Sequence, residues 1–343
     1  MLFPLRRFLG LIFIALGIFI AGSYFYTKYY LFSITIKEDP VVYMKQLEQE
    51  HDWQRLEIYA DFVRHMPFSD STKKLANQMY EEAKRERSSL MYNVKGCMQG
   101  LASEDVNSLS SAICDFGINL TPIGDIRDLG EQFIFHVTCG LSGVWCNEED
   151  NFIAALSAIG IALTFTPELN ITDSMLKVLK EAKAISTDMV EYILKLGKDA
   201  LHKFDLSAVK DFMKVNWEYF SAFRKFGFEP IQDTYIYAKD GRDVEKMVKL
   251  TKEYKAPEAY VAILETDGKV LRTDKPLAFF SPKFSILNII KSGLKTGKAG
   301  AWRLMADWIY NKLGVFSVVV GLLIFALGVD MFSGDLIIKI LKR

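Results

Sequence analysis

The chain of 343 residues lacks an excess of charge of either sign, since 42 lysines and arginines stand against 42 aspartates and glutamates. Proteins that bind nucleic acid carry a basic surface, so this balance argues against a nucleic-acid partner. Histidine is scarce as well, and the four copies do not form the HExxH spacing of a zinc enzyme: His51, His65, His136 and His202. We therefore expect no nucleic acid, no metal and no cofactor.

A complete catalytic motif is also missing. The run GLKTGKA at Gly293 resembles a phosphate loop, but its spacing is one residue short. Ala299 stands where a serine or threonine would hold magnesium. The sequence does not predict an enzyme by motif, and the enzyme question stays open.

Two long uncharged segments are present, and the first covers 19 residues from Phe8 to Tyr26. As a helix it would be about 28 Å long, close to the hydrocarbon thickness of a bilayer. Arg6 and Arg7 precede it, and a tyrosine-rich cluster of the kind found at membrane interfaces follows. The alternative is a cleaved signal peptide ending at Ala21–Ser23, although the apolar core is long for one. We predict a transmembrane helix over residues 8–26.

The second uncharged segment runs from Leu313 to Val329. Gly314, Gly321 and Gly328 recur every seven residues, which places small residues on one helix face suited to helix contact in lipid. We predict a second transmembrane helix over residues 313–329, with a protein partner or a second copy of the chain packed on that face. A buried core helix is the alternative. Aromatic residues that would anchor the segment at the interface precede it: Trp302, Trp308 and Tyr310.

The flanking charges predict an orientation. Arg6 and Arg7 favour a cytoplasmic N-terminus, so the central region would lie across the membrane and the basic residues 330–343 would return to the cytoplasm. Basic residues also crowd the near side of the second segment, which makes the charge bias there ambiguous: Lys291, Lys295, Lys298, Arg303 and Lys312.

All four cysteines lie in the region predicted to be exported: Cys97, Cys114, Cys139 and Cys146. An even number of cysteines within fifty residues suits two disulfide bonds in an oxidising compartment, with three connectivities open. Buried free thiols are the alternative. Zinc is disfavoured, because the spacing lacks the close cysteine pairs of zinc modules.

Elsewhere the pattern predicts a mainly α-helical protein, with a helical domain between two transmembrane helices and one small β-hairpin. The hairpin signal is Asp267-Gly268 within Tyr260–Leu271. The expected helices cover 41–50, 53–66, about 69–94, 172–204, 207–226, about 241–254 and 281–291. The expected regions are a cytoplasmic N-terminus (1–7), a span (8–26), a helical hairpin region (27–96), a Cys/Gly-rich central module (97–170), a helical domain (171–290), a linker (291–312), a span (313–329) and a basic tail (330–343).

The central run LTPIGDIRDL has the features of a helix start. Thr121 is a capping residue, Pro122 suits the first helical position, and Asp125 and Asp128 fall in the first turn, where the helix dipole favours carboxylates. The functional alternative makes Asp125, Asp128 and Glu131 weak candidates for a general acid or base.

This run resembles the core of the pre-toxin TG module of bacterial polymorphic toxins over residues 114–166. The matching residues are Pro122, Gly124, Asp125, Asp128, Gly140, Gly143 and Gly160. The resemblance implies a bacterial, envelope-associated module with a packed apolar helical hairpin. Toxicity is not implied, because no toxin domain follows the matched region. Phe152–Thr166 would be a buried helix or a segment that dips into the membrane.

These expectations favour a bacterial inner-membrane protein that contacts the lipid bilayer and projects a periplasmic helical domain with a structural or interaction role. One alternative is an envelope-acting hydrolase that uses Asp125 and Asp128. A toxin-associated or export factor is the other, and it depends on the resemblance alone.

Overall fold

The computed structural model describes residues 2–88, 167–203, 205–296 and 299–333. The chain divides into two compact units. We call residues 1–39, 66–71 and 273–343 the anchor unit, and residues 40–65 and 72–272 the helical unit. The helical unit is thus inserted, in the order of the sequence, between the two ends of the chain.

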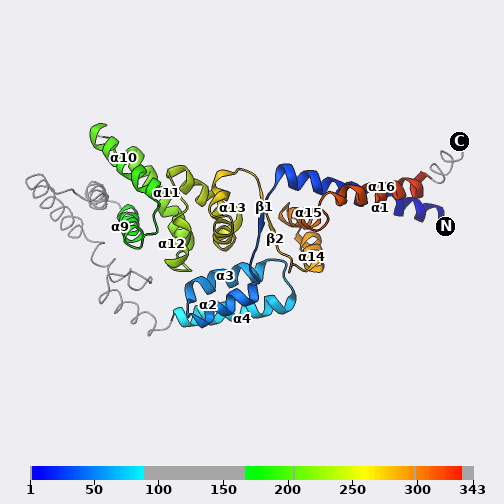
Figure 1. Ribbon diagram of the computed structural model, residues 1–343, viewed down its shortest axis with the longest axis horizontal. Helices are drawn as coiled ribbons and strands as arrows, with labels where there is room; N and C mark the ends of the chain where they lie inside the picture. Colours follow the sequence, from blue (N-terminus) through cyan, green and yellow to red (C-terminus); the bar gives the residue numbers. More distant parts are fainter. Residues whose placement is uncertain (1, 89–166, 204, 297–298, 334–343) are drawn as a thin grey trace, which may run out of the picture. The chain divides into compact units, whose positions relative to one another are not determined.

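Two apolar helices of the anchor unit lie side by side and antiparallel (Figure 1): α1 (Leu2–Tyr30) and α16 (Phe316–Ser333). Glycines bring their backbones together. A Cβ atom placed on Gly17 would lie 2.6 Å from the carbonyl oxygen of Gly321, and one on Gly328 would lie 2.6 Å from the amide nitrogen of Ile14. The predicted glycine face therefore forms a contact within the chain at Gly321 and Gly328. Gly314 is not part of it, because its φ of +54° places it in the turn before α16.

The outer faces of this pair are exposed and apolar. Both helices are long and apolar enough to cross a membrane, and only 17% of each apolar window is buried within the chain. A core helix of a soluble domain buries its apolar residues, so this exposure contradicts the core-helix alternative for α16. The large exposed apolar residues of the pair include Phe8, Leu11, Ile12, Leu16, Ile18, Phe25, Phe316, Val319, Leu322, Leu323 and Leu327.

A two-stranded parallel sheet joins the two ends of the chain. Strand β1 (Phe32–Thr35) pairs with β2 (Leu277–Phe280), Phe32 lying opposite Leu277. Helices α14 (Ile286–Thr296) and α15 (Ala299–Leu313) follow β2. The linker predicted over residues 291–312 is therefore wrong: most of it is helical, because Ala306 and Ile309 give α15 a buried side.

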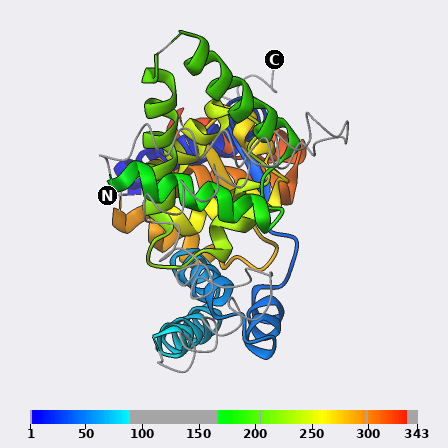
Figure 2. The same ribbon diagram turned by 90° about the vertical axis from the view of Figure 1, so that its left-hand side faces the viewer.

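The helical unit contains most of the remaining helices. Figure 2 shows the first three nearly end-on, running roughly parallel to one another. The elements are α2 (Pro40–Gln49), α3 (Trp53–His65), α4 (Asp70–Arg87, its first two residues belonging to the anchor unit), α9 (Pro167–Glu181), α10 (Thr187–Lys203), α11 (Ser207–Phe223), α12 (Glu229–Tyr235), α13 (Gly241–Glu265) and the short 3-10 helix η1 (Lys269–Arg272).

Aromatic residues of α11 and α12 form the core of the helical unit. Tyr219, Phe223 and Tyr235 are fully buried, and the Tyr235 hydroxyl donates to Oδ1 of Asn216 at 2.6 Å. A tyrosine hydroxyl in a core needs such a partner, since an unpaired buried polar group is costly. The dense aromatics of α11 serve as core, as their helical spacing indicates.

The predicted β-hairpin at Asp267-Gly268 is wrong. Tyr260 lies in α13, and the Asp267-Gly268 turn ends that helix: the Gly268 N–H donates to the Ile263 carbonyl at 2.9 Å. Both turn residues have positive φ, 49° and 71°. Residues 259–263 are buried on every side. The resulting unbroken apolar run cannot be distinguished by periodicity from a buried strand.

The single helix predicted over Thr172–Phe204 is also wrong, because two helices occupy this range. Helix α9 ends at Glu181 and α10 begins at Thr187, and Lys183 between them has a φ of +54°. Pro167 begins α9 at the first helical position, where its missing N–H is not needed. The apolar residues before and after the break still follow the spacing of a single helix. The sequence pattern therefore does not reveal that the helix is interrupted.

Candidate functional site

The residues singled out from the sequence as candidate site residues lie outside the described residues. This holds for the weak catalytic candidates, for the cysteines and for the motif shared with the pre-toxin TG module: Asp125, Asp128, Glu131, Cys97, Cys114, Cys139, Cys146, Pro122 and Gly124. Phe152–Thr166 lies outside them too. The structure brings together a different set of polar residues.

This set, which we call the Arg55 cluster, consists of Asp52, Arg55, Glu229, Asp233 and Tyr260. The Arg55 guanidinium donates to both carboxylate oxygens of Asp233, at 2.7 Å each, and to Asp52 at 2.5 Å. The Tyr260 hydroxyl donates to Asp233 at 2.9 Å. A planar guanidinium matches a carboxylate in this two-bond geometry, which fixes orientation as well as charge. The cluster therefore ties α3, α12 and α13 together.

Glu229 is the unusual member of the Arg55 cluster. Burial raises its pKa to about 9, and the neighbouring negative charges of Asp52 and Asp233 act in the same direction, against Arg55. Glu229 is therefore protonated at neutral pH. A neutral Glu229 adds no further negative charge to the cluster, which limits the repulsion within it.

A cavity of about 450 Å³ opens beside the cluster. Its lining is Tyr43, Arg55, Ala182, Lys183, Ala184, Gln232, Asp233, Ile236, Tyr237, Tyr260 and Leu264. Of the three carboxyls of the Arg55 cluster, Asp233 alone lines it. The lining also carries two cations, Arg55 and Lys183, and three tyrosines. Both carboxylate oxygens of Asp233 already accept from Arg55, so the cavity presents charges of both signs beside aromatic rings.

A second group of charges lies along the other side of α3. Arg87 donates to Glu57, and burial raises the pKa of Glu57 against that attraction. Burial would also raise the pKa of Asp61, but a hydrogen bond from His65 and the charges of Lys225 and Arg64 hold it well below its usual value. These carboxylates are neutralised within the fold, so we interpret this group as structural.

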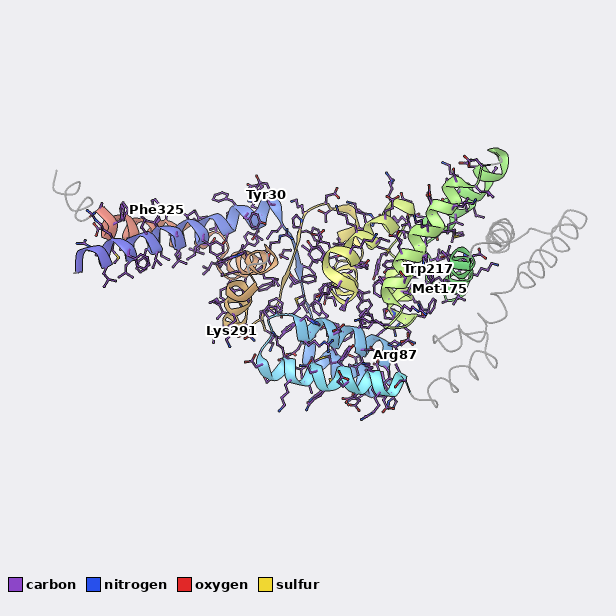
Figure 3. All side chains as sticks on the ribbon, turned by 180° about the vertical axis from the view of Figure 1, so that it is seen from behind. Tyr30, Arg87, Met175, Trp217, Lys291 and Phe325 are labelled. Carbon is purple, nitrogen blue, oxygen red and sulfur yellow. The ribbon has the colours of Figure 1, made fainter. Side chains whose placement is uncertain are left out.

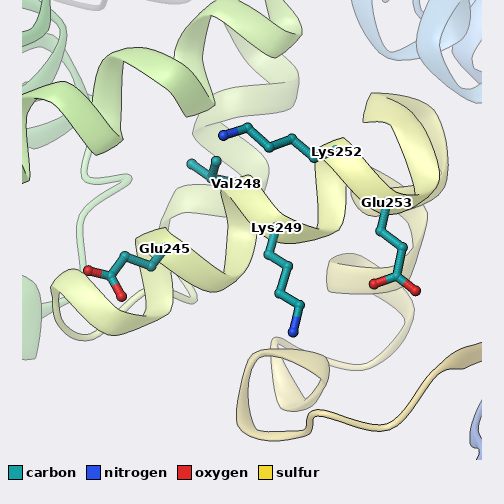
Figure 4. Close-up of a pocket in the computed structure, with 5 residues that line it drawn as sticks. All are labelled: Glu245, Val248, Lys249, Lys252 and Glu253. Carbon is teal, nitrogen blue, oxygen red and sulfur yellow. The ribbon is translucent and has the colours of Figure 1, made fainter.

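A shallow hollow on α13 is lined by Glu245, Val248, Lys249, Lys252 and Glu253. Figure 4 shows its charged side chains spreading in different directions along the helix surface. Lys252 forms an ion pair with Glu218 of α11 at 2.6 Å. Side chains that do not converge cannot hold a small ligand, so the hollow is not a candidate site.

The anchor unit holds a buried acid where α15 meets the strands. Asp307 is fully buried, and burial raises its pKa to about 6, against the hydrogen-bonding effect of Ser33 and Asn311. Among the described residues, no group of three histidine, cysteine, aspartate or glutamate side chains has the geometry to hold a metal ion. Asp307 is an isolated carboxyl whose charge the local packing disfavours.

Helix α15 also packs along α1 through aromatic rings. The rings of Trp302 and Phe19 meet edge to face with centroids 5.7 Å apart, and those of Tyr310 and Tyr24 lie 5.6 Å apart. Two of the three aromatics predicted to anchor the second span therefore contact the first span. Such rings are common where a protein meets the membrane interface.

Comparisons with protein-family models, with curated proteins and with solved structures found no match to this chain. Functional argument therefore depends on the residues themselves. The Arg55 cluster was missed from the sequence because Asp52 and Asp233 are far apart along the chain. The local signals, an Asp-x-x-Arg and a Glu-x-x-x-Asp on helices, are ordinary surface pairs until tertiary packing brings them together.

Proposed function

We propose that this protein is a membrane-anchored scaffold that holds the helical unit at the surface of a bilayer, with a structural or interaction role. One observation carries the proposal: α1 and α16 are held together by glycine contacts while their outer faces stay apolar and exposed. In water such a surface would aggregate, whereas in lipid it is the favourable surface.

In this proposal the helical unit has a binding role. Its aromatic core and the Arg55 cluster fasten its helices, and the adjacent cavity is lined by three tyrosines together with Arg55, Lys183 and Asp233. Side chains of a protein partner that enter this cavity would meet hydrogen-bonding groups and charges of both signs. A homo-oligomer remains a prediction, and it would need a surface other than the glycine face used within the chain.

The proposal includes an orientation. Arg6 and Arg7 on one side of α1 favour a bacterial inner-membrane protein with cytoplasmic ends and the helical unit in the periplasm. The cysteines would then be free to form disulfide bonds. The basic residues next to α16 weaken this bias, so the orientation needs a direct test.

The test combines membrane extraction with a reporter. Full-length protein should stay in the membrane pellet after alkaline carbonate washing, as integral proteins do. Alkaline phosphatase inserted after Lys239, an exposed residue between α12 and α13, should be active, and a green fluorescent protein at the same site should stay dark. Release by carbonate would overturn the anchor. Retention with the opposite reporter result would keep the anchor and reverse the orientation.

A further inference from the structure

Helix α14 exposes apolar side chains although one of its faces is already packed. Ile289 is buried within the anchor unit, whereas Ile286, Leu287 and Ile290 are 45%, 65% and 37% exposed. These three positions follow the spacing of one helix face, so they form a single apolar surface. Such a cluster needs a partner, because isolated exposed apolar residues are ordinary but a contiguous group on one helix is not.

Basic residues flank this surface. Lys283 and Lys291 are exposed at its two ends, and Lys283 forms an exposed ion pair with Asp39 at 3.3 Å, which is worth little. The surrounding sequence has the same character, because residues 275–306 contain no aspartate or glutamate. Their six basic residues are Lys275, Lys283, Lys291, Lys295, Lys298 and Arg303. In a chain without net charge this is a marked local excess.

The position of α14 identifies the partner. Helix α14 packs on α15, and α15 packs along the part of α1 near Phe19 and Tyr24. Both short helices lie on the side of the two strands from which α1 and α16 extend (Figure 1). Figure 3 labels Lys291 on α14, which belongs to the same unit as Tyr30 and Phe325 of the apolar pair. The exposed face of α14 therefore belongs to the same unit as the surface that we assign to lipid, connected to it through α15.

We infer that α14 is an interfacial helix that inserts Ile286, Leu287 and Ile290 at the boundary of the same bilayer and binds anionic lipid headgroups through Lys283 and Lys291. An apolar face bordered by lysines is the pattern of helices that lie in the membrane plane. Lysines close to an anionic surface add electrostatic attraction that a zwitterionic surface lacks. This inference depends on the proposed membrane anchor, and it adds a preference for lipid charge.

The test places an environment-sensitive fluorescent amino acid at Leu287 in full-length protein reconstituted into vesicles with brominated acyl chains. The control position is Arg85 in the helical unit, a side chain that is 73% exposed and paired with Glu86. Fluorescence at position 287 should be quenched strongly in phosphatidylcholine with phosphatidylglycerol and weakly in phosphatidylcholine alone. Position 85 should not be quenched in either.

The lysines have a matched control. In vesicles with phosphatidylglycerol, the double variant Lys283→Gln/Lys291→Gln should lower the ratio of membrane-docked to undocked α14 on the order of ten-fold. Lys210→Gln/Lys214→Gln, a pair of exposed lysines on α11, should leave that ratio unchanged.

Failure of the membrane anchor and failure of the inference about α14 give different results. Protein washed off by carbonate would contradict the anchor itself. Carbonate-resistant protein whose position 287 is not quenched would contradict the inference about α14 alone. Shielding of position 287 from an aqueous quencher without lipid quenching would assign the surface to a protein partner. Quenching that does not depend on phosphatidylglycerol or on the two lysines would exclude anionic-lipid recognition.

Discussion

At the scale of single residues, Gly17 is the position that most clearly requires a glycine. A Cβ atom there would lie 2.6 Å from both the Gly321 carbonyl oxygen and the Phe325 amide nitrogen, whereas one on Gly22 would meet nothing within 4 Å. Real Cβ atoms do not approach backbone so closely, so the helices must separate in a Gly17→Ala variant. The small-residue contact that holds α1 against α16 would then be lost.

We expect Gly17→Ala to destabilise the anchor unit by about 1 to 3 kcal/mol, the usual cost of overpacking. Gly22→Ala should be neutral or stabilising by roughly 0.5 to 1 kcal/mol, since alanine favours a helix over glycine. The measurement is unfolding of full-length protein in mixed detergent with increasing sodium dodecyl sulfate, followed by fluorescence. Equal behaviour of the two variants would contradict the close contact.

The raised pKa of Glu229 predicts that the free energy of unfolding depends on pH. Its pKa is raised to about 9, above the ordinary value of 4.5, so the folded state binds a proton that the unfolded state releases between these values. The free energy of unfolding must therefore fall as pH rises through this range. Glu229→Gln imitates the protonated form, so its free energy of unfolding should not show the decrease with pH that Glu229 causes. It should match the wild type near pH 5 and exceed it at pH 8.5 by on the order of 1 to 3 kcal/mol.

The measurement is urea unfolding at pH 5, 7 and 8.5, and Glu245→Gln is the control because that glutamate is exposed on α13. A difference between Glu229→Gln and wild type that does not change with pH would show that Glu229 is ionised in the folded protein.

Arg55 and Arg242 form a matched pair for testing geometry. Arg55 donates to both carboxylate oxygens of Asp233 in a partly buried site, whereas Arg242 donates twice to one oxygen of Asp240 with a side chain that is 88% exposed. Lysine keeps the charge but loses the two-bond geometry. We expect Arg55→Lys to lower the free energy of unfolding by about 1 to 2 kcal/mol, and Arg242→Lys to change it by less than about 0.5 kcal/mol. Thermal unfolding of both variants at pH 7 provides the comparison, and similar losses would contradict a special role for the Arg55 cluster.

At the scale of elements, local signals located several helices well. The helices expected over 53–66 and from about 69 correspond to α3, which ends at His65, and to α4, which starts at Asp70. The helix expected from about residue 241 starts at Gly241, where Asp240 caps α13 by accepting from the N–H groups of Arg242 and Asp243. These features depend on residues within one turn of each other, so a sequence displays them directly.

Contacts between segments that are far apart along the chain could not be predicted from the sequence in this way. The register of β1 against β2 joins residues separated by most of the chain, and four-residue strands have little pattern of their own. The Arg55 cluster has the same origin, since Asp233 meets Arg55 only after α12 packs on α3. For the anchor helices, the periodic glycines predicted a contact face but did not identify which helix would fill it.

Strain inside α13 gives an element-scale prediction. Lys255 interrupts the helix with φ 67° and ψ 167°, a region that is populated almost entirely by glycine. Lys255→Gly removes the clash of the Cβ atom at this point, and we expect it to raise the free energy of unfolding by about 1 kcal/mol despite the greater freedom of the unfolded chain. Lys249→Gly, within the regular part of α13, should instead destabilise by about 1 kcal/mol. Chemical unfolding of both variants measures the difference, and destabilisation by both would indicate that residue 255 is regular helix in solution.

At the scale of the whole molecule, the order of the segments explains how an apolar anchor and a large helical unit coexist in one chain. The anchor unit is assembled from both ends of the sequence, through the α1–α16 contact and the parallel strands. The helical unit begins and ends beside those strands in sequence, at Pro40 and Arg272. Its core residues, such as Tyr219 and Tyr235, come from within its own range, so we expect this core to fold without the spans.

This arrangement predicts that residues 40–272 fold as a separate soluble protein. The exception is Phe68, which belongs to the anchor unit and packs against Phe284 with ring centroids 4.8 Å apart. Removing residues 273–343 would expose that ring, so Phe68→Ser should improve the solubility of the fragment without loss of helix. The fragment should be helical by circular dichroism, should unfold cooperatively, and should stay in the supernatant with vesicles that sediment the full-length protein. A fragment that aggregates or lacks a cooperative transition even with Phe68→Ser would show that the helical unit needs the anchor unit to fold.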